Sequence, residues 1–171
     1  GPVRMMWAVA DLTIVIVSWN VGELLRRCLQ SILATELDVE VVVVDNASID
    51  GSPEMVRAAF PQVRLIANDE NRGFTAANNQ GLAVAQGRCL LLLNPDTEVV
   101  ADALATMVRY LEAHPAVGAL GPRLLFPDGR QQPSRRRFPT LATALVESTV
   151  IQEWWAENRI LRRYYMADTP D

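Results

Sequence analysis

Four short apolar runs, separated by stretches with helical spacing, constrain the fold of this 171-residue chain more than any other feature. The second run, VEVVVV at 39–44, is almost entirely apolar, as expected for a parallel strand that helices cover on both faces. Strands that alternate with helices form an open sheet with right-handed crossovers. The sequence therefore predicts an α/β fold with an open, mostly parallel sheet flanked by helices.

Apolar periodicity and terminating residues place the expected elements. Ser48 or Asp50 is the expected cap of the second helix, and Asp102 that of the fourth. A short apolar run at 117–120 and a hairpin around residues 128–129 follow. We expect strands at 12–18, 39–44, 63–67 and 89–93, and helices at 21–34, 52–60, 74–85 and from Asp102 to about 113.

The side-chain inventory excludes several kinds of site. All 16 basic residues are arginines, so a P-loop lysine, a Schiff-base lysine and a lysine general base are absent. A single histidine, His114, excludes a multi-histidine metal centre and is expected only to end a helix. Cys28 and Cys89 form no CxxC, which argues against zinc and a disulfide scaffold. A dinucleotide-binding Rossmann domain is disfavoured because no GxGxxG follows the first run, and the net charge of −4 argues weakly against nucleic acid as a partner.

The chain divides into three parts on composition. We expect an N-terminal segment at 1–11, whose Gly1-Pro2 reads as the remnant of a cleaved tag, a sheet domain at 12–131, and a loop with an amphipathic helical extension at 132–171. No apolar run approaches the ~20 residues that cross a bilayer, and the opening segment does not resemble a signal peptide. We expect a cytoplasmic protein, either free or at the inner face of the cell membrane.

Polar residues follow every apolar run, at the edge where open α/β sheets bind ligands. Asp96 lies on a turn stiffened by Pro95, where a carboxylate can bind a divalent cation or simply cap backbone amides. Asp45 either accepts a hydrogen bond from a nucleobase or forms a common Asp-Asn turn. The segments that follow the four runs are Ser18-Trp19-Asn20, residues 45–48, residues 68–73 (in which Arg72-Gly73 meets phosphate or is a solvated loop) and Asn94-Pro95-Asp96.

Taken in order, these pieces resemble the N-terminal donor-binding part of a family 2 glycosyltransferase with the Rossmann-like GT-A fold. The resemblance is closest to the bacterial rhamnosyltransferase-like subgroup of polysaccharide biosynthesis. It covers roughly residues 12–140, through the segments TIVIVSWN, VVVVDNASIDGS, NDENRGFTAANNQGLAVAQG, LLLNPDTEV, GPRLLFPDGRQQPS and RRRFPT.

The resemblance implies roles for individual residues. Val17 and Trp19 would line the pocket of the base, and Asp45 would hydrogen-bond a pyrimidine, with Asp50 nearby. Residues 71–81 would wrap the diphosphate-sugar side. The implied nucleotide-binding set is Val17, Trp19, Asp45, Asp50, Asn71, Gly73, Asn79 (of the family's Asn-x-Gly), Asn94 and Asp96.

The same resemblance implies a bound divalent metal, and the sequence departs from the family's pattern at two positions. Asp96 would hold Mg²⁺ or Mn²⁺ on the donor diphosphate, in the place of the family's DXD motif. Asn94 replaces the first acid of that motif, which leaves one metal carboxylate. Asn78 stands where many relatives carry arginine, so the phosphate would rely more on metal and backbone.

The implied reaction is inverting transfer from a dTDP- or UDP-sugar to a cell-surface glycan or a lipid-linked acceptor. The carboxylate base of relatives lies beyond the position that corresponds to Asp171, so we expect this chain to bind nucleotide and to transfer sugar poorly. A non-catalytic nucleotide-binding module is the alternative. A nucleotidyltransferase is disfavoured because the chain has neither the Gly-rich loop nor the lysine of that class.

The C-terminal extension predicts one amphipathic helix with an aromatic face. Arg159 and Arg163 lie opposite that face. The helix either meets anionic lipid at a membrane surface or, as the favoured reading, packs on protein, including a second copy in a homodimer. The predicted face comprises Val150, Ile151, Trp154, Trp155, Leu161, Tyr164 and Tyr165.

Overall fold

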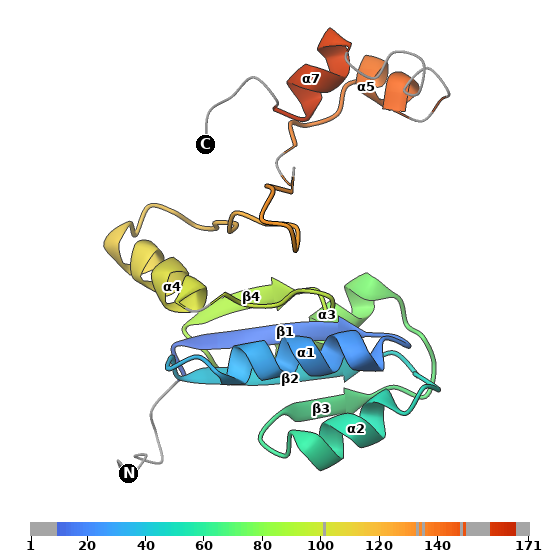
Figure 1. Cartoon of the computed structure of the whole chain (residues 1–171), viewed down its shortest axis with the longest axis vertical. Helices are drawn as coiled ribbons and strands as arrows, with labels where there is room; N and C mark the ends of the chain where they lie inside the picture. Colours follow the sequence, from blue (N-terminus) through green and yellow to red (C-terminus); the bar gives the residue numbers. More distant parts are fainter. Residues whose placement is uncertain are drawn as a thin grey trace. The chain divides into compact units, whose positions relative to one another are not determined.

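The computed structural model describes residues 10–100, 102–132, 134, 136–147, 149 and 158–166. The chain forms two compact units, Gly1–Leu120 and Gly121–Asp171 (Figure 1). The division predicted from composition, after residue 131, falls within the second of these units. Among the described residues, the first unit contains the sheet and the four helices that cover it, and the second contains two short helices.

The sheet has four parallel strands in the order β3-β2-β1-β4. β1 pairs with β2 along its whole length, so that Ser18 at the end of β1 lies opposite Asp45 at the end of β2. The chain builds outward from β1 to β3 and then returns to place β4 on the other side of β1. Ligands of open sheets bind outside the carboxyl ends of strands near such a reversal. The strands are β1 (Leu12–Ser18), β2 (Val39–Asp45), β3 (Arg64–Ala67) and β4 (Cys89–Leu93).

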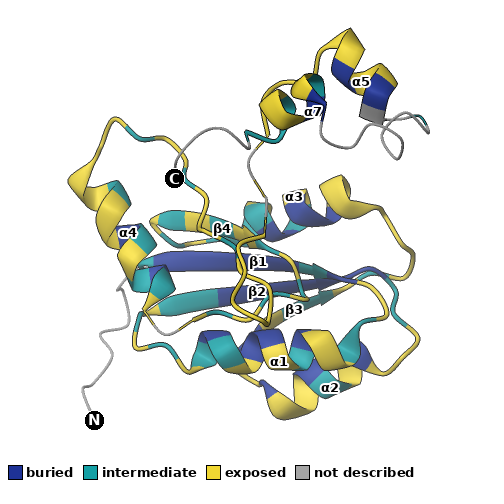
Figure 2. Ribbon diagram, turned by 45° about the horizontal axis from the view of Figure 1, so that its top comes forward, coloured by how far each residue is buried: buried dark blue, intermediate teal, exposed yellow. Residues whose placement is uncertain are grey.

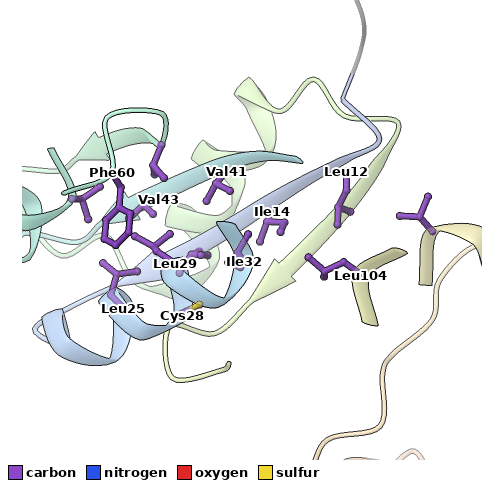
Figure 3. Close-up of a cluster of buried hydrophobic side chains, with 14 residues drawn as sticks. Leu12, Ile14, Leu25, Cys28, Leu29, Ile32, Val41, Val43, Phe60 and Leu104 are labelled. Atoms are coloured by element: carbon purple, nitrogen blue, oxygen red, sulfur yellow. The ribbon is translucent and has the colours of Figure 1, made fainter. Parts of the chain in front are cut away.

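Alternation along the strands sends side chains to two separate cores. Ile14 and Ile16 join the larger core, with buried side chains from α1, α2 and α4 (Figure 3). Val15 points to the other face, where it packs with Ala77 of α3. Figure 2 shows α1 and α2 on one side of the sheet and α3 on the other. These helices are α1 (Gly22–Leu33), α2 (Ser52–Ala59), α3 (Phe74–Val84) and α4 (Ala103–Ala113).

The predicted elements of the first unit are confirmed to within two residues, and the strands at 12–18 and 89–93 coincide with prediction. The second helix has Gly51 at its N-cap instead of Ser48 or Asp50. Asp102 does occupy the N-cap of α4, but its carboxylate accepts from the Thr106 hydroxyl at 3.4 Å and caps no backbone N–H.

Two further expectations concern the segment after α4. The run at 117–120 is not a strand, because its backbone pairs with no strand among the described residues. The hairpin around residues 128–129 is confirmed. Leu125 and Gln131 form an antiparallel bridge, and Gly129 takes the positive φ of 82° that the tight turn requires.

The second unit contains α5 (Leu141–Glu147) and α7 (Arg159–Tyr164). The prediction of one continuous helix through Tyr165 is wrong, because Asn158 is extended and begins a new helix by accepting a hydrogen bond from the Leu161 N–H at 2.8 Å. Val150, Ile151, Trp154 and Trp155 lie outside the described residues. Within the part of the chain that is described, no helix has the length and apolar character needed to cross a membrane.

Candidate functional site

The loops that follow β1 and β2 are joined by side-chain hydrogen bonds. The Asn20 N–H donates to Ser48 Oγ at 2.9 Å, and the Ile49 N–H donates to Asn20 Oδ1 at 2.8 Å. Asn20 has a positive φ of 54°, a conformation that asparagine tolerates better than most residues. Trp19, held in this loop, is 56% exposed. Sequence reasoning gave Asn20 no role, although an asparagine directly after a strand signals such a turn.

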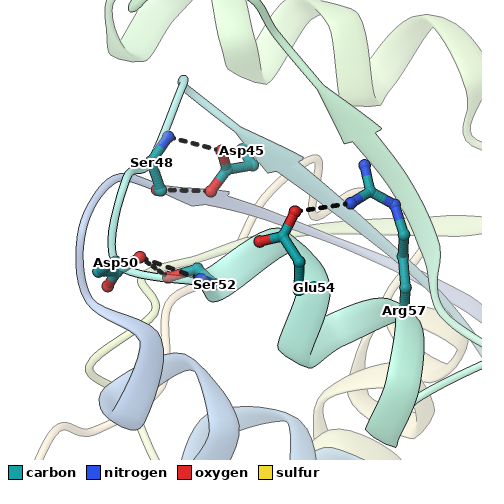
Figure 4. Close-up of polar contacts among 6 residues, drawn as sticks. All are labelled: Asp45, Ser48, Asp50, Ser52, Glu54 and Arg57. Atoms are coloured by element: carbon teal, nitrogen blue, oxygen red, sulfur yellow. Dashed lines mark hydrogen bonds and ion pairs between the residues drawn. The ribbon is translucent and has the colours of Figure 1, made fainter.

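Asp45 ends β2 and organises the turn that follows it. Its Oδ2 accepts from the Ser48 N–H at 2.8 Å and its Oδ1 from the Ser48 hydroxyl at 2.6 Å (Figure 4). The residue is 1% exposed. The Asp-Asn turn weighed in the sequence analysis is therefore present. A carboxylate oxygen accepts up to about two hydrogen bonds, so the contacts with Ser48 leave part of the acceptor capacity of this buried carboxylate unused.

Asp50 binds the first backbone amides of two helices. Its Oδ2 accepts from the Gly22 N–H at 2.9 Å, at the start of α1. Its Oδ1 accepts from the Ser52 N–H at 3.0 Å and from the Ser52 hydroxyl, at the start of α2. The Ser52 hydroxyl is the main cause that holds the pKa of Asp50 below its usual value, and the Gly22 N–H adds to it. Asp50 therefore supplies negative charge where both helix dipoles favour it.

Three amide side chains form a cluster between the sheet edge and α3. Asn68 and Gln80 exchange two hydrogen bonds of 2.9 Å. Asn68 Nδ2 also donates to Asn46 Oδ1 at 3.0 Å, and Asn46 Nδ2 donates to the Gly73 carbonyl at 3.4 Å. The sequence analysis noted Asn46 and Asn68 only as polar residues after strands, and it missed Gln80. The available signal was that both asparagines directly follow a strand.

The predicted phosphate-facing segment begins with a tight turn. Asn71 Oδ1 accepts from the Gly73 N–H at 2.9 Å, and Gly73 has φ 79°, which strains any residue with a side chain. α3 starts directly after Gly73 without a side-chain cap. The N–H groups of its first turn therefore have no intrahelical acceptor and favour an anion.

α3 presents its two neighbouring asparagines differently. Asn79 is exposed, whereas Asn78 is buried and donates from Nδ2 to the Phe74 carbonyl of its own helix at 2.9 Å. Asn78 is thus committed to the backbone. Gly81 lies against Val15 of β1 so closely that a Cβ would collide with it.

Asp96 lies on the turn after β4, on the other side of β1 from Asp45. It is exposed, and no described residue forms a hydrogen bond or ion pair with its carboxylate. Its neighbour Glu98 is paired with Arg27 at 2.8 Å. Burial, followed by the charges of Asp96 and Glu98, raises the pKa of Cys28 to about 12. Asp96 is therefore the carboxylate of this turn that no described residue pairs.

The carboxylates at this edge of the sheet determine how a metal ion could bind here. Across the described ranges, no three His, Cys, Asp or Glu side chains come together as a metal site. A single exposed carboxylate fits Mg²⁺ or Mn²⁺ when the other oxygen ligands come from phosphates and water. The Asn94 carbonyl is already used, since it accepts from the Thr97 N–H at 3.2 Å and contacts Cys28 Sγ at 3.8 Å.

Known proteins similar to this chain include enzymes of polysaccharide synthesis. A protein from Rhizobium meliloti named succinoglycan biosynthesis protein ExoO is 42% identical over 107 residues, covering 61% of this chain and 31% of that protein. A Mycobacterium tuberculosis N-acetylglucosaminyl-diphospho-decaprenol L-rhamnosyltransferase is 31% identical over 159 residues, covering 86% of this chain and 52% of the relative. The chain thus spans from about a third to half of the length of these relatives.

Solved structures with the GT-A fold are also similar. The mannosyltransferase PcManGT from Pyrobaculum calidifontis, in complex with GDP-Man and Mn²⁺, has a TM-score of 0.62 and 32% identity over 71% of this chain and 37% of that chain. S. aureus TarS 1-349 in complex with UDP-GlcNAc, at 20% identity and a TM-score of 0.56, shares the fold over 68% of this chain and 38% of that chain. The model of the protein family described as glycosyl transferase family 2 matches residues 13–168 of this chain. This chain therefore belongs to glycosyltransferase family 2.

Proposed function

We propose that this chain is the donor-binding part of an inverting glycosyltransferase that takes a dTDP- or UDP-sugar together with Mg²⁺ or Mn²⁺. The observation that carries the proposal is Asp96, an exposed carboxylate that no described residue pairs, at the sheet edge where α/β folds bind ligands. The uncapped start of α3 lies at the same edge and favours phosphate.

The ends of β1 and β2 form the base side of the proposed site. Trp19 offers an exposed ring for stacking on a base, and half-buried Val17 lines the strand beside it. Asp45 accepts from the base N–H with the acceptor capacity that Ser48 leaves. Asp50, in the loop that follows Asp45, holds the starts of α1 and α2 through its hydrogen bonds to their first N–H groups.

The turn at Asn71 and Gly73 and the first turn of α3 form the phosphate side. The Gly73 N–H donates to Asn71 Oδ1, so the backbone N–H groups of the first turn of α3 are the ones that face the diphosphate, while exposed Asn79 lies on the sugar side. Asn94 shapes the turn that presents Asp96. Asp96 holds the metal, which when bound offsets the negative charge that develops on the leaving nucleoside diphosphate.

The comparisons support the coarser form of this proposal, a nucleoside diphosphate sugar as donor and a lipid-linked sugar as acceptor. PcManGT is described with GDP-Man and Mn²⁺, a nucleoside diphosphate sugar and a divalent metal. The similar rhamnosyltransferase is named for an acceptor in which a sugar is linked through diphosphate to a decaprenol lipid. For the whole protein we propose transfer to a cell-surface glycan or lipid-linked acceptor, at the inner face of the membrane.

Calorimetric titration with dTDP, UDP and GDP, each with and without Mn²⁺, tests the proposal. We expect one pyrimidine diphosphate to bind only with metal, and this binding to be lost in Asp96→Ala. Glu36→Ala, which removes an exposed carboxylate from the loop between α1 and β2 at the opposite edge, is the matched control and should bind as wild type does.

Three outcomes would contradict parts of the proposal. Binding that persists in Asp96→Ala would remove the metal role of Asp96. Binding of GDP but of neither dTDP nor UDP would refute the proposed preference for a pyrimidine nucleotide. Tight nucleotide binding by a full-length protein that transfers no sugar to any glycan or lipid-linked acceptor would favour the non-catalytic binding module.

A further inference from the structure

The amide cluster of Asn46, Asn68 and Gln80 carries an inference about the site. We propose that these three positioning residues hold the turn at Asn71–Gly73 in place for the donor diphosphate. This inference rests on the proposed function, because it assigns the turn to the diphosphate. It adds a cause for the geometry of the turn, and the three amide residues lie outside the set expected to touch the nucleotide.

The cluster is anchored to the ends of β1 and β2 by backbone hydrogen bonds. The Asn46 N–H donates to the Ser18 carbonyl at 2.8 Å, and the Asn68 N–H donates to the Asp45 carbonyl at 2.9 Å. Both bonds extend the strand ladders by one residue. The backbones of the two asparagines are thereby fixed relative to the ends of β1 and β2.

Hydrogen bonds of the three side chains link these fixed backbones to α3. Both N–H groups of the Asn68 amide are used, one toward Asn46 Oδ1 and one toward Gln80 Oε1. Gln80 returns a bond to Asn68 Oδ1, and Asn46 reaches the Gly73 carbonyl. α3 is therefore connected to the sheet edge at two points, within its second turn at Gln80 and at its N-cap.

The turn has little else to hold it. Every residue from 69 to 76 is exposed, and the first buried side chain of the helix is Ala77. The Gly73 carbonyl accepts from both the Ala77 N–H at 3.2 Å and Asn46 Nδ2. Hydrogen bonds therefore hold this part of the chain where side-chain packing does not. A site that binds phosphate through backbone N–H groups needs them fixed to within about 0.5 Å.

Neutral amides suit this task beside a diphosphate. They donate and accept without adding negative charge near the phosphates, and they do not titrate near neutral pH. A carboxylate in any of the three positions would lose a donor and repel the ligand.

Nucleotide titrations on Gln80→Ala and Asn68→Ala, with UDP and UMP or dTDP and dTMP in the presence of Mn²⁺, test the proposal. Gln80→Ala removes two neutral hydrogen bonds and Asn68→Ala removes three. We expect either variant to weaken diphosphate binding by on the order of tenfold, while monophosphate binding changes less than twofold. Gln30→Ala, an exposed glutamine on α1, is the matched control and should leave both affinities unchanged. In the double variant, Gln80→Ala adds no further loss because its partner is already absent.

Amide hydrogen exchange on the same variants, without nucleotide, tests the positioning itself. The N–H groups of Gly73 and Ala77, which bond to the Asn71 side chain and the Gly73 carbonyl, should exchange at least several-fold faster in Asn68→Ala, while α1 stays as protected as in wild type. An equal fall in diphosphate and monophosphate affinity, or unchanged exchange at Gly73 and Ala77, would overturn the proposal. If wild type binds no nucleotide, the proposed function and the diphosphate role fail together, and the exchange result still decides whether the cluster holds the turn.

Discussion

Replacing Gly81 by alanine tests how closely α3 packs on the central strand. A Cβ at Gly81 would lie well inside 3.0 Å of Val15 Cγ1, a separation that real Cβ atoms essentially never show, and 3.3 Å from Val15 Cγ2. Val15 is fully buried, and its branched side chain is stiff at χ1. Helix and strand must therefore move apart to admit the methyl group.

Two opposing effects set the size of the change. Alanine is favoured over glycine within a helix by about 1 kcal/mol. Overpacking of a tight core costs typically ~1–3 kcal/mol, and we take the upper end because the collision is with a stiff, fully buried side chain. The net prediction for Gly81→Ala is a loss of about 2 kcal/mol in the free energy of unfolding, which corresponds to a urea midpoint roughly 1 M lower.

Urea denaturation followed by circular dichroism measures this loss. Gly118→Ala is the control, since a Cβ there meets nothing within 4 Å, and its effect should stay within about 0.5 kcal/mol. In a Val15→Ala background the added methyl group enters vacated space, so the double variant should be more stable than the sum of the single losses predicts. A Gly81→Ala protein as stable as wild type, or more stable, would refute the close packing of α3 on β1.

Three further predictions test separate features. At pH 8 a thiol reagent should label half-buried Cys89 well before Cys28, whose pKa is raised to about 12 by burial and by nearby acids; equal rates would contradict the buried position. Because the pKa of Asp50 is lowered by folding, its contribution to stability is present above its ordinary value of 3.8 and is lost as the pH falls through the lowered value. The stability gap between wild type and Asp50→Asn, measured in urea near pH 7 and near pH 3, should therefore shrink in acid, and a constant gap would be inconsistent with this charge effect. Gly87→Ala should lower the melting temperature markedly, because its Cβ would collide with the Thr13 backbone N; a melting temperature unchanged from wild type would show that the α3–β4 connection can shift.

The local sequence predicted the elements of the first unit well because each strand is a run of apolar residues bounded by polar ones. Leu12–Ser18 and Cys89–Leu93 have the expected bounds. The extension was predicted less well. A pattern of aromatic residues cannot show that Asn158 breaks the helix, since asparagine is tolerated in helices and its cap role depends on the backbone taking an extended conformation.

The sequence by itself determined the order of strands and helices, and with it the edge of the sheet where Asp45 and Asp96 lie, because parallel strands end on the same side. Only the tertiary structure decided what each polar side chain does at that edge. In the folded chain Asp45 accepts hydrogen bonds from Ser48, and Asp50 accepts from the backbone at the starts of two helices. Asp96 has no hydrogen-bond or ion-pair partner among the described residues. The tertiary structure also brings Gln80 to Asn68, a contact across 12 positions that no local pattern encodes. Hydrogen bonding depends on the positions of individual atoms to within a few tenths of an ångström, and these are fixed only when helices and sheet pack together.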